Sequence, residues 1–273
     1  MTSPQPHQLP AECLQLPARQ EFCAEEPTRL QRGSIAALAS HGGAARESWT
    51  PDGVDDGSQI STLAEALHQY ACTQLRSDLE AKVVDPAEIT KIATRSYRHA
   101  NGFTKLVLSD SDTGRLRLHV WEPDARAEEN IHEHRWHFAS VVLTGSINSE
   151  IWADSFDFDA PTFSEFIYQV GKRGAARRPV GRSRVACLRK VVRAAGDAYF
   201  MLPGVMHRIT ETCGLTSTLV FTTAPSRSWN RMLAREGVVP DVRRRALRPR
   251  EVIRLIDLIL CQLSVRDVHV CRP

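Results

Sequence analysis

The stretch Ile131-His-Glu-His-Arg-Trp-His-Phe138, followed by Ala139-Ser-Val-Val-Leu-Thr-Gly145, decides how the rest of the chain is interpreted. It places three histidines within six residues, directly before an apolar run that ends on a glycine. Because a strand alternates its side chains between two faces, His132 and His134 are expected to point the same way. Two imidazoles on one face can share a cation, and imidazole suits iron, zinc, copper and nickel.

A second block, Gly196-Asp-Ala-Tyr-Phe-Met-Leu-Pro-Gly-Val-Met-His207, supplies a candidate third ligand. Pro203-Gly204 predicts a tight turn that delivers His207 at the start of the next strand. A lone His-x-His motif in a β-rich chain is more often structural than metal-binding. The second block changes that balance, and the sequence predicts a metal site made of His132, His134 and His207.

Length and composition are those of an ordinary globular protein. The chain has 273 residues, 42% of them apolar and 25% charged, which favours one domain with appendages. A net charge of +3 is too small to indicate nucleic acid or membrane as a partner. The sequence shows no apolar run of membrane-span length and no signal-peptide pattern at its start, so a cytoplasmic location is expected. Seven scattered cysteines without Cys-x-x-Cys spacing argue against disulfides and favour a reducing compartment.

The chain divides into four predicted regions. Proline and glycine punctuation predicts a poorly ordered extension over 1–57, and helical spacing predicts a helical region over 58–102 that packs on a barrel. The helical signals are a capping box at Thr62 and Glu65, and Asp85-Pro86 at the start of a second helix. The barrel is expected over 103–225 and a C-terminal helical region over 226–273, with a short helix at 226–236 and an amphipathic helix at 249–263.

Between residues 103 and 225 the apolar period is two. In the segment 115–121, Leu116, Leu118 and Val120 are expected on one face, and the intervening side chains on the other. Those intervening side chains are Arg117, His119 and Trp121. Eight or nine short strands separated by turn signals predict a mainly β fold, an antiparallel β-barrel or jelly roll with flanking N- and C-terminal helices. The other predicted strands are 104–108, 139–143, 147–153, 162–170, 184–192, 198–202, 207–210 and 217–223.

The two histidine blocks resemble the two motifs of the cupin superfamily. His132, His134 and Gly145 match its first motif, and the second block matches its later glycine, proline–glycine and histidine pattern. The resemblance covers about residues 100–225 and implies a metal in a cupin-type barrel. With its helical region before the barrel, the chain is more narrowly similar to the cysteine dioxygenase (thiol dioxygenase) group. In that group three histidines bind Fe(II) and the enzymes oxidise a thiol with dioxygen.

Carried over residue by residue, the resemblance has departures. The metal-binding glutamate of many cupins would fall near Phe138, which cannot ligate, so the resemblance implies a neutral three-histidine site. The arginine that binds the substrate carboxylate would fall near Lys105, which keeps the charge without the bidentate fork. The Ser-x-His-x-Tyr segment becomes Ser217-Thr-Leu-Val-Phe221 and lacks both the histidine and the tyrosine. No cysteine lies near His137 to form the thioether crosslink of the group.

Four further side chains are candidates around the ligands, each with a structural alternative. Lys105 is a candidate for an anionic substrate, Trp136 shares the ligand face, and Phe221 is expected to contribute an apolar wall. His137 has the opposite parity to His134, and a supporting or acid–base role competes with a purely structural one. The Arg-rich segments near 172–184 and 243–250 lack interleaved aromatics, so solvated loops account for them better than nucleic acid binding does.

These observations give one leading hypothesis and two alternatives. The leading hypothesis is a mononuclear non-haem Fe(II) dioxygenase that acts on a small amino-acid-like or thiol substrate with dioxygen. The first alternative is a non-oxidative lyase or isomerase that uses the cation as a Lewis acid. The second is a small-molecule-binding cupin without catalysis. Zinc, manganese and nickel remain alternatives to iron.

Overall fold

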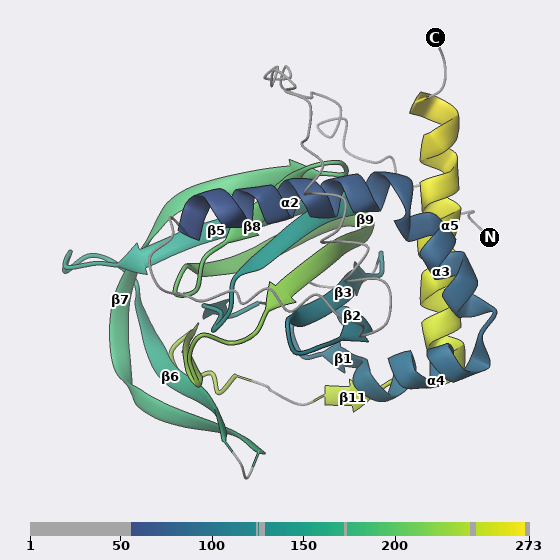
Figure 1. Ribbon diagram of the computed structural model, residues 1–273. Helices are drawn as coiled ribbons and strands as arrows, with labels where there is room; N and C mark the ends of the chain where they lie inside the picture. Colours follow the sequence, from purple (N-terminus) through teal and green to yellow (C-terminus); the bar gives the residue numbers. More distant parts are fainter. Residues whose placement is uncertain (1–55, 124, 126–128, 172–173, 241–243, 271–273) are drawn as a thin grey trace, which may run out of the picture.

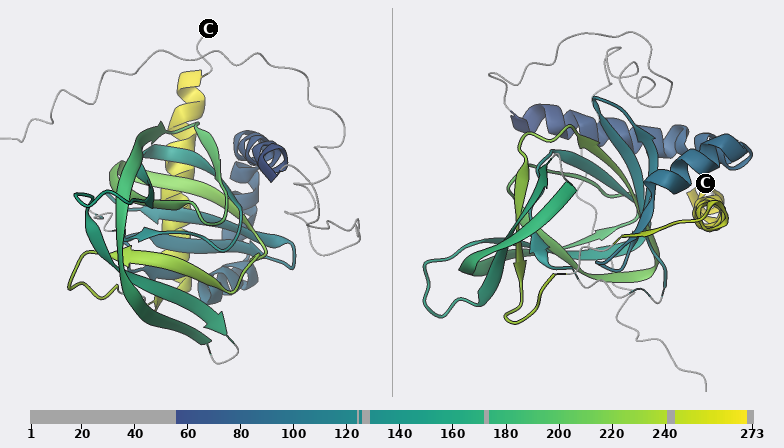
Figure 2. Two further views of the ribbon diagram at one scale, coloured as in Figure 1. Left: turned by 90° about the vertical axis from the view of Figure 1, so that its left-hand side faces the viewer. Right: turned by 90° about the horizontal axis from the view of Figure 1, so that it is seen from below.

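The computed structural model describes residues 56–123, 125, 129–171, 174–240 and 244–270. It consists of an antiparallel β-sheet wound on itself, with helices outside it from both ends of the described chain (Figures 1 and 2). The predicted fold class, a mainly β antiparallel barrel of the jelly-roll kind with flanking helices, is confirmed. The poorly ordered extension predicted over 1–57 lies outside the described residues, apart from its last two positions.

The barrel closes because one strand has partners on both sides of the sheet. Starting from β9, the pairings run through β4, β10, β6, β7 and β5, and β5 pairs β9 again. The strands β3, β2, β1 and β11 extend the sheet from β9. The strands are β1 (Tyr97–His99), β2 (Thr104–Asp110), β3 (Gly114–Trp121), β4 (Ile131–His132), β5 (Phe138–Asp154), β6 (Thr162–Gly171), β7 (Gly174–Ala194), β8 (Ala198–Met201), β9 (Met206–Thr223), β10 (Trp229–Ala234) and β11 (Arg244–Ala246).

Helices cover the outside of this sheet. The helix α2 runs along β5 and β8, and α5 packs against α3 and α4 (Figure 1). The predicted start of α4 is confirmed, because the Asp85 side chain accepts hydrogen bonds from two backbone N–H groups and Pro86 follows it. None of the described helices is long and apolar enough to cross a membrane. The helices are α2 (Asp56–Thr73), α3 (Leu75–Val83), α4 (Pro86–Arg95) and α5 (Pro249–Val270).

Two strands are much longer than the sequence predicts. Both β5 and β9 continue where the pattern predicted a break, and their pairing shifts register between Val142 and Ser146. Gly145 lies in this irregular stretch with φ 67°, and a Cβ there would lie 2.7 Å from the carbonyl oxygen of Cys213. The glycine therefore marks a bulge within a strand, where the sequence analysis placed the end of one.

The short helix predicted over 226–236 is wrong. Residues Trp229–Ala234 form β10, which pairs with β6 along its whole length and with β4 at one end. A second short strand, Arg244–Ala246, pairs with β1. The reason is tertiary, since strand pairing satisfies the backbone of a short segment whose own helical preference is weak. The C-terminal region is therefore helical only from Pro249 onward.

The main hydrophobic core lies between the sheet and the helices. It joins the outward-facing residues of β2, β3, β5 and β9 to the apolar faces of the helices. Leu118 and Leu219 come from the strands, and Leu79, Ile92 and Ile256 come from the helices; none of them has exposed area. The inner face of the same strands is left to line the interior of the barrel.

Candidate metal centre

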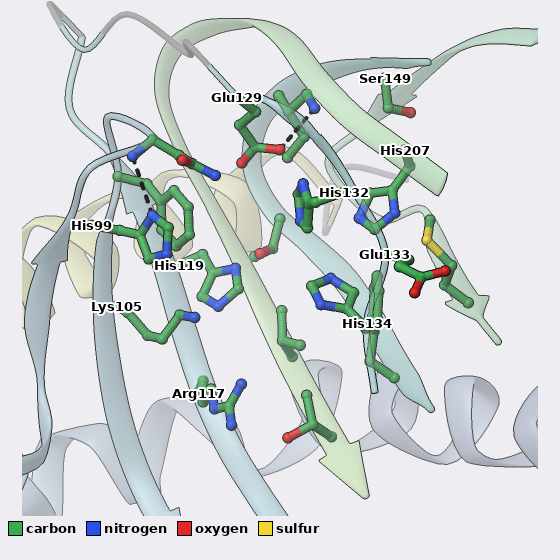
Figure 3. Close-up of a pocket in the computed structure, with 18 of the residues that line it drawn as sticks. His99, Lys105, Arg117, His119, Glu129, His132, Glu133, His134, Ser149 and His207 are labelled. Atoms are coloured by element: carbon green, nitrogen blue, oxygen red, sulfur yellow. Dashed lines mark hydrogen bonds between the residues drawn. The ribbon is translucent and has the colours of Figure 1, made fainter. Parts of the chain in front are cut away.

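Three histidines converge inside the barrel (Figure 3). One ligand nitrogen from each of His132, His134 and His207 lies within 4.8 Å of the others. His132 on β4 and His207 on β9 are direct register partners, which brings together two residues 75 positions apart in the chain. Their ring centroids lie 4.6 Å apart, and that of His134 lies 5.0 and 4.9 Å from them. The structure thus places the three predicted ligands in one group.

His134 reaches this group by a different route from the one expected. The regular strand ends at His132, and the residues 133–137 have no strand structure. The prediction assumed that His132 and His134 both lie in a regular strand, and this is true only of His132. The sequence placed them correctly on one side because an extended segment still alternates its side chains.

Two of the three rings are oriented by backbone carbonyls. Nδ1 of His132 lies 2.9 Å from the Asn130 carbonyl oxygen, and Nδ1 of His207 lies 3.0 Å from that of Val205. A carbonyl can only accept, so each Nδ1–H donates and each Nε2 keeps a free lone pair. Metal-binding histidines are usually oriented in this way by a partner on the other ring nitrogen. The donor set therefore fits a divalent cation that accepts imidazole nitrogen.

Burial keeps the imidazoles in the form that can ligate. It lowers the pKa of His207 to about 3 and that of His134 well below its ordinary value. Neighbouring positive charges add to the effect, from His132 and Arg193 on His207 and from Lys105 and Arg117 on His134. Neutral imidazole is the species that binds a metal ion, so neither ring must lose a proton at neutral pH.

Phe138, whose side chain cannot ligate a cation, lies against the histidine group. Its ring centroid lies 5.0 Å from that of His134 and 6.0 Å from that of His207. Among the described residues, no carboxylate joins the three-histidine group. The site is therefore neutral before any cation binds, and a divalent cation would keep its full charge.

A buried ion pair supports the loop that carries two of the histidines. The Glu133 carboxylate, only 4% exposed, accepts from the Arg227 guanidinium at 2.6 Å and from the Arg231 backbone N–H at 2.9 Å. The Arg227 guanidinium also donates to the carbonyl oxygen of His134 at 3.2 Å. The segment after β9 thus fixes the backbone between and after the first two histidines. This pair could not be predicted from the sequence, because its members are 94 positions apart and share no motif.

The histidines line a cavity of about 180 Å³ inside the barrel. Two predicted substrate-binding residues, Lys105 and Trp136, lie in its lining, and the Trp136 ring stacks on that of His134 at 5.5 Å. The inner face of β3 contributes Arg117, His119 and Trp121, as its alternation predicts. The cavity is small enough to favour a small molecule, with aromatic rings on its walls and charged groups between them.

Burial also weakens the positive charge of the cavity's basic groups. It lowers the pKa of the Lys105 ammonium well below its ordinary value, and that of the Arg117 guanidinium to about 10. The same desolvation lowers the pKa of His119 and raises that of the Glu129 carboxyl. Desolvation disfavours every charged form, so these shifts indicate groups that water does not stabilise.

Two predicted site residues do not line the cavity. Phe221 belongs to the core between sheet and helices, whereas its neighbours Val220 and Thr222 line the cavity. A shift of one position moves a side chain to the other face of a strand. The positions matched to the histidine and tyrosine of Ser-x-His-x-Tyr, Leu219 and Phe221, therefore face the core and not the cavity. His137 is also absent from the lining, and its Nδ1 is buried without a hydrogen-bond partner among the described residues. His137 therefore has no contact with the cavity through which it could play the predicted supporting role.

The structure adds cavity residues that the sequence analysis did not select. They include Glu129, Tyr199, Arg193 and Arg244. Glu129 accepts from the backbone N–H of Ile209, and the Arg193 guanidinium lies 4.1 Å from the ring centroid of Tyr199. They come from a loop and from β7, β8 and β11, and only the pairing of the strands brings them to one place.

Comparisons with known proteins find only distant likenesses. No protein-family model and no curated protein matches the chain. Among solved structures, a DMSP lyase is 15% identical over 45% of this chain and 47% of its own, with a TM-score of 0.28. This chain thus spans about half the length of that structure. An RmlC-like cupin from Shewanella frigidimarina is 19% identical over 46% of this chain and 79% of its own, with a TM-score of 0.27.

A third similar structure is hydroquinone 1,2-dioxygenase from a Sphingomonas species. It is 13% identical over 44% of this chain and 65% of its own, with a TM-score of 0.29. With TM-scores below 0.5, none of these likenesses carries an argument about what this chain binds or does. Its chemistry has to be argued from its own residues.

Proposed function

We propose that this protein is a metal-dependent cupin oxygenase, a mononuclear non-haem Fe(II) dioxygenase that acts on a small amino-acid-like or thiol substrate. The observation that carries the proposal is the group formed by His132, His134 and His207 in the lining of one cavity inside the barrel. Backbone carbonyls orient the rings of His132 and His207 and leave the Nε2 lone pair of each ring free. A ferrous ion bound there would supply the redox chemistry by which dioxygen reacts with an organic substrate.

The residues around the histidines would bind and shield the substrate. The Lys105 ammonium faces the cavity and offers a charge to an anionic end of the substrate. Trp136 and Phe138 pack against the His134 ring and exclude water from one side of the site. Exclusion of water strengthens electrostatic contacts and protects reactive species from side reactions.

A non-oxidative reaction is the second candidate, a lyase or isomerase step with the cation as Lewis acid. The observation that favours it is the Glu129 carboxyl, which lines the same cavity as the histidines. A positioned carboxyl group can take a proton from a substrate or return one, and a redox reaction does not require it. The thiol dioxygenases have a histidine and a tyrosine in their Ser-x-His-x-Tyr segment. The residues of the matching segment that line this cavity, Thr218 and Val220, offer neither an imidazole nor a phenol.

The first test is metal analysis of protein purified without oxygen, followed by oxygen-uptake measurements with a panel of amino acids and thiols. We expect about one iron per chain, and oxygen consumption that depends on one class of substrate. Stoichiometric zinc with no oxygen consumption would refute the oxygenase and favour the Lewis-acid alternative.

The ligand assignment is tested by a matched pair of variants. His207→Ala removes a nitrogen from the group, so the variant should lose bound metal. His137→Ala removes a histidine from the loop that carries His134, and this histidine does not line the cavity, so metal content should stay unchanged. Unchanged metal in His207→Ala would exclude His207 as a ligand.

A further inference from the structure

One end of the cavity holds two cationic side chains that form no ion pair among the described residues. Lys105 on β2 and Arg117 on β3 both line the cavity, and Arg117 is 5% exposed. Neither side chain forms an ion pair with a carboxylate of the described residues, although many other basic groups do. The cations that are paired include Arg98, Arg208, Arg227 and Arg231. A buried charge is costly unless it is paired, so this end of the cavity calls for an anion.

Several polar atoms that line the cavity also lack a hydrogen-bond partner. Arg117 Nε, His119 Nε2 and Thr222 Oγ1 are buried without a hydrogen-bond partner, and all three residues line the cavity. In Figure 3 the Lys105 ammonium, the Arg117 guanidinium and the His119 ring converge on one side of His134. Buried polar groups without partners are uncommon in folded proteins, and an anion bound at this end would give these groups their partners.

A third unpaired cation lies on the opposite side of the histidines. Arg193 on β7 donates a hydrogen bond from Nη1 to Ser149 Oγ at 2.7 Å, and its guanidinium lies over the Tyr199 ring. Ser149 lies beyond His207, whereas Arg117 lies on the other side of His134 (Figure 3). Arg193 too forms no ion pair with a carboxylate among the described residues. Ser149 and Tyr199 hold the guanidinium in place without neutralising it.

The carboxylates of the cavity do not balance these charges. Its lining contains four cationic side chains and two carboxylates, Glu129 and Glu133. Glu133 is already paired with Arg227, which lies outside the lining, and Glu129 accepts from the backbone of Ile209. An excess of positive charge therefore remains on both sides of the histidine group. The four cationic side chains are Lys105, Arg117, Arg193 and Arg244.

We propose that the cavity binds a small dianion, with one acid group at Lys105 and Arg117 and the other at Arg193, so that the carbon chain between them passes the three histidines. This deepens the proposed function by naming the substrate class, and it rests on that function only for the reaction. The binding itself needs neither the metal nor dioxygen, so it can be tested alone.

The test is calorimetric titration of the full-length protein, both as purified and stripped of metal, with matched acids of three to five carbons. The dicarboxylates are malonate, succinate and glutarate, and the monocarboxylates are propionate, butyrate and valerate. The best dicarboxylate should bind at least about tenfold more tightly than the monocarboxylate of equal length, because it gains one charge-assisted contact. No advantage at any of the three lengths would overturn the proposal.

Variants locate the second acid group. Arg193→Gln should reduce the dicarboxylate advantage to less than about threefold while leaving monocarboxylate affinity unchanged. Arg193→Lys should keep most of the advantage, because it keeps the charge. Arg189→Gln removes an exposed arginine of the same strand and should change neither affinity. An undiminished advantage in Arg193→Gln would refute the role of Arg193, and thermal unfolding checks that each variant is folded.

The two proposals fail in different ways. Dicarboxylate preference in a protein that takes up no iron and consumes no oxygen would leave the dianion site standing and remove the oxygenase. Iron-dependent oxygen uptake with a monoanionic substrate, together with no dicarboxylate preference, would leave the oxygenase standing and remove the dianion site.

Discussion

The two faces of strand β3 have opposite characters. Its outward residues Leu116, Leu118 and Val120 are apolar, at most 5% exposed, and packed against other core residues. Its inward residues Arg117 and His119 carry buried polar atoms that have no hydrogen-bond partner among the described residues. The outward face buries only apolar side chains, and their packing stabilises the fold. The other leaves groups unsatisfied, as expected of a surface that completes its contacts with a ligand.

Charges buried near the histidines divide in the same way. Glu133 is paired with Arg227 and supports the loop that carries the histidines, whereas Arg117 faces the cavity and forms no ion pair with a carboxylate of the described residues. Paired charge should therefore behave as structure and unpaired charge as a binding site. Four predictions test this division, from the largest expected effect to the smallest.

Replacement of Leu118 by Ala should lower the free energy of unfolding by about 3 kcal/mol, because it leaves a cavity in the core. Leu118 has no exposed area and belongs to the core between sheet and helices. Urea unfolding measures the loss, and metal content should stay the same in the folded variant. If the Leu118→Ala protein is fully folded and still loses metal, the outward face of β3 also affects the metal site, and the division between the two faces is wrong.

Replacement of Arg227 by Gln should lower the free energy of unfolding by about 2 kcal/mol, since it leaves the buried Glu133 carboxylate without its cation. The value is set below that of a fully buried pair because the Arg227 side chain is 27% exposed. Metal affinity should fall about tenfold, since the His134 carbonyl loses its donor. Arg235→Gln, at an exposed site nearby, is the control and should change neither quantity.

His99 should make the metal-free protein less stable in acid. Burial lowers the pKa of His99 from 6.5 to about 2 in the folded state, so the unfolded chain takes up a proton that the folded chain refuses. Stability is therefore full above pH 6.5 and falls by about 1.4 kcal/mol per pH unit below it. In His99→Gln the slope between pH 6 and pH 4 should be smaller by that amount. Above pH 7 the two slopes should agree, and equal slopes in acid would contradict the prediction.

Replacement of Arg117 by Met should have the smallest effect on stability, with the opposite sign. It removes an unpaired buried charge and keeps most of the side-chain volume, so the ligand-free protein should gain about 1 kcal/mol. Chemical denaturation of the metal-free protein measures the gain. A loss as large as that of Leu118→Ala would show that Arg117 is structural, and would remove the distinction between the two faces.

Local alternation was enough to predict several features. It separated Leu118 from Arg117 and His119, and it placed His132 and His134 on one side of an extended segment. Asp85-Pro86 predicted the start of a helix because a cap acts on the residues that immediately follow it. Lys105 and Trp136 also line the cavity; Lys105 was selected from the resemblance, and Trp136 from the parity of its own segment.

Predictions that depended on a distant partner were less successful. Phe221 was assigned to the cavity by an alignment one position out of register, and bulges in the β5–β9 pairing make such a shift invisible in the sequence. The segment 229–234 was predicted to be helical because its partner β6 lies some 60 residues earlier. Arg193 was overlooked because nothing near it in the chain indicates that β7 returns to the histidines.

The sequence by itself determined the mainly β class, the two histidine blocks and the apolar residue Phe138 that follows the first block. These features follow from spacing and residue type, which act over a few positions. Only the tertiary structure decided that His207 meets His132 across a strand pair, that Arg227 supports Glu133, and that unpaired cations stand on both sides of the histidines. Pairing register and burial are properties of the whole chain, because the energy of a buried charge depends on what the rest of the fold places beside it.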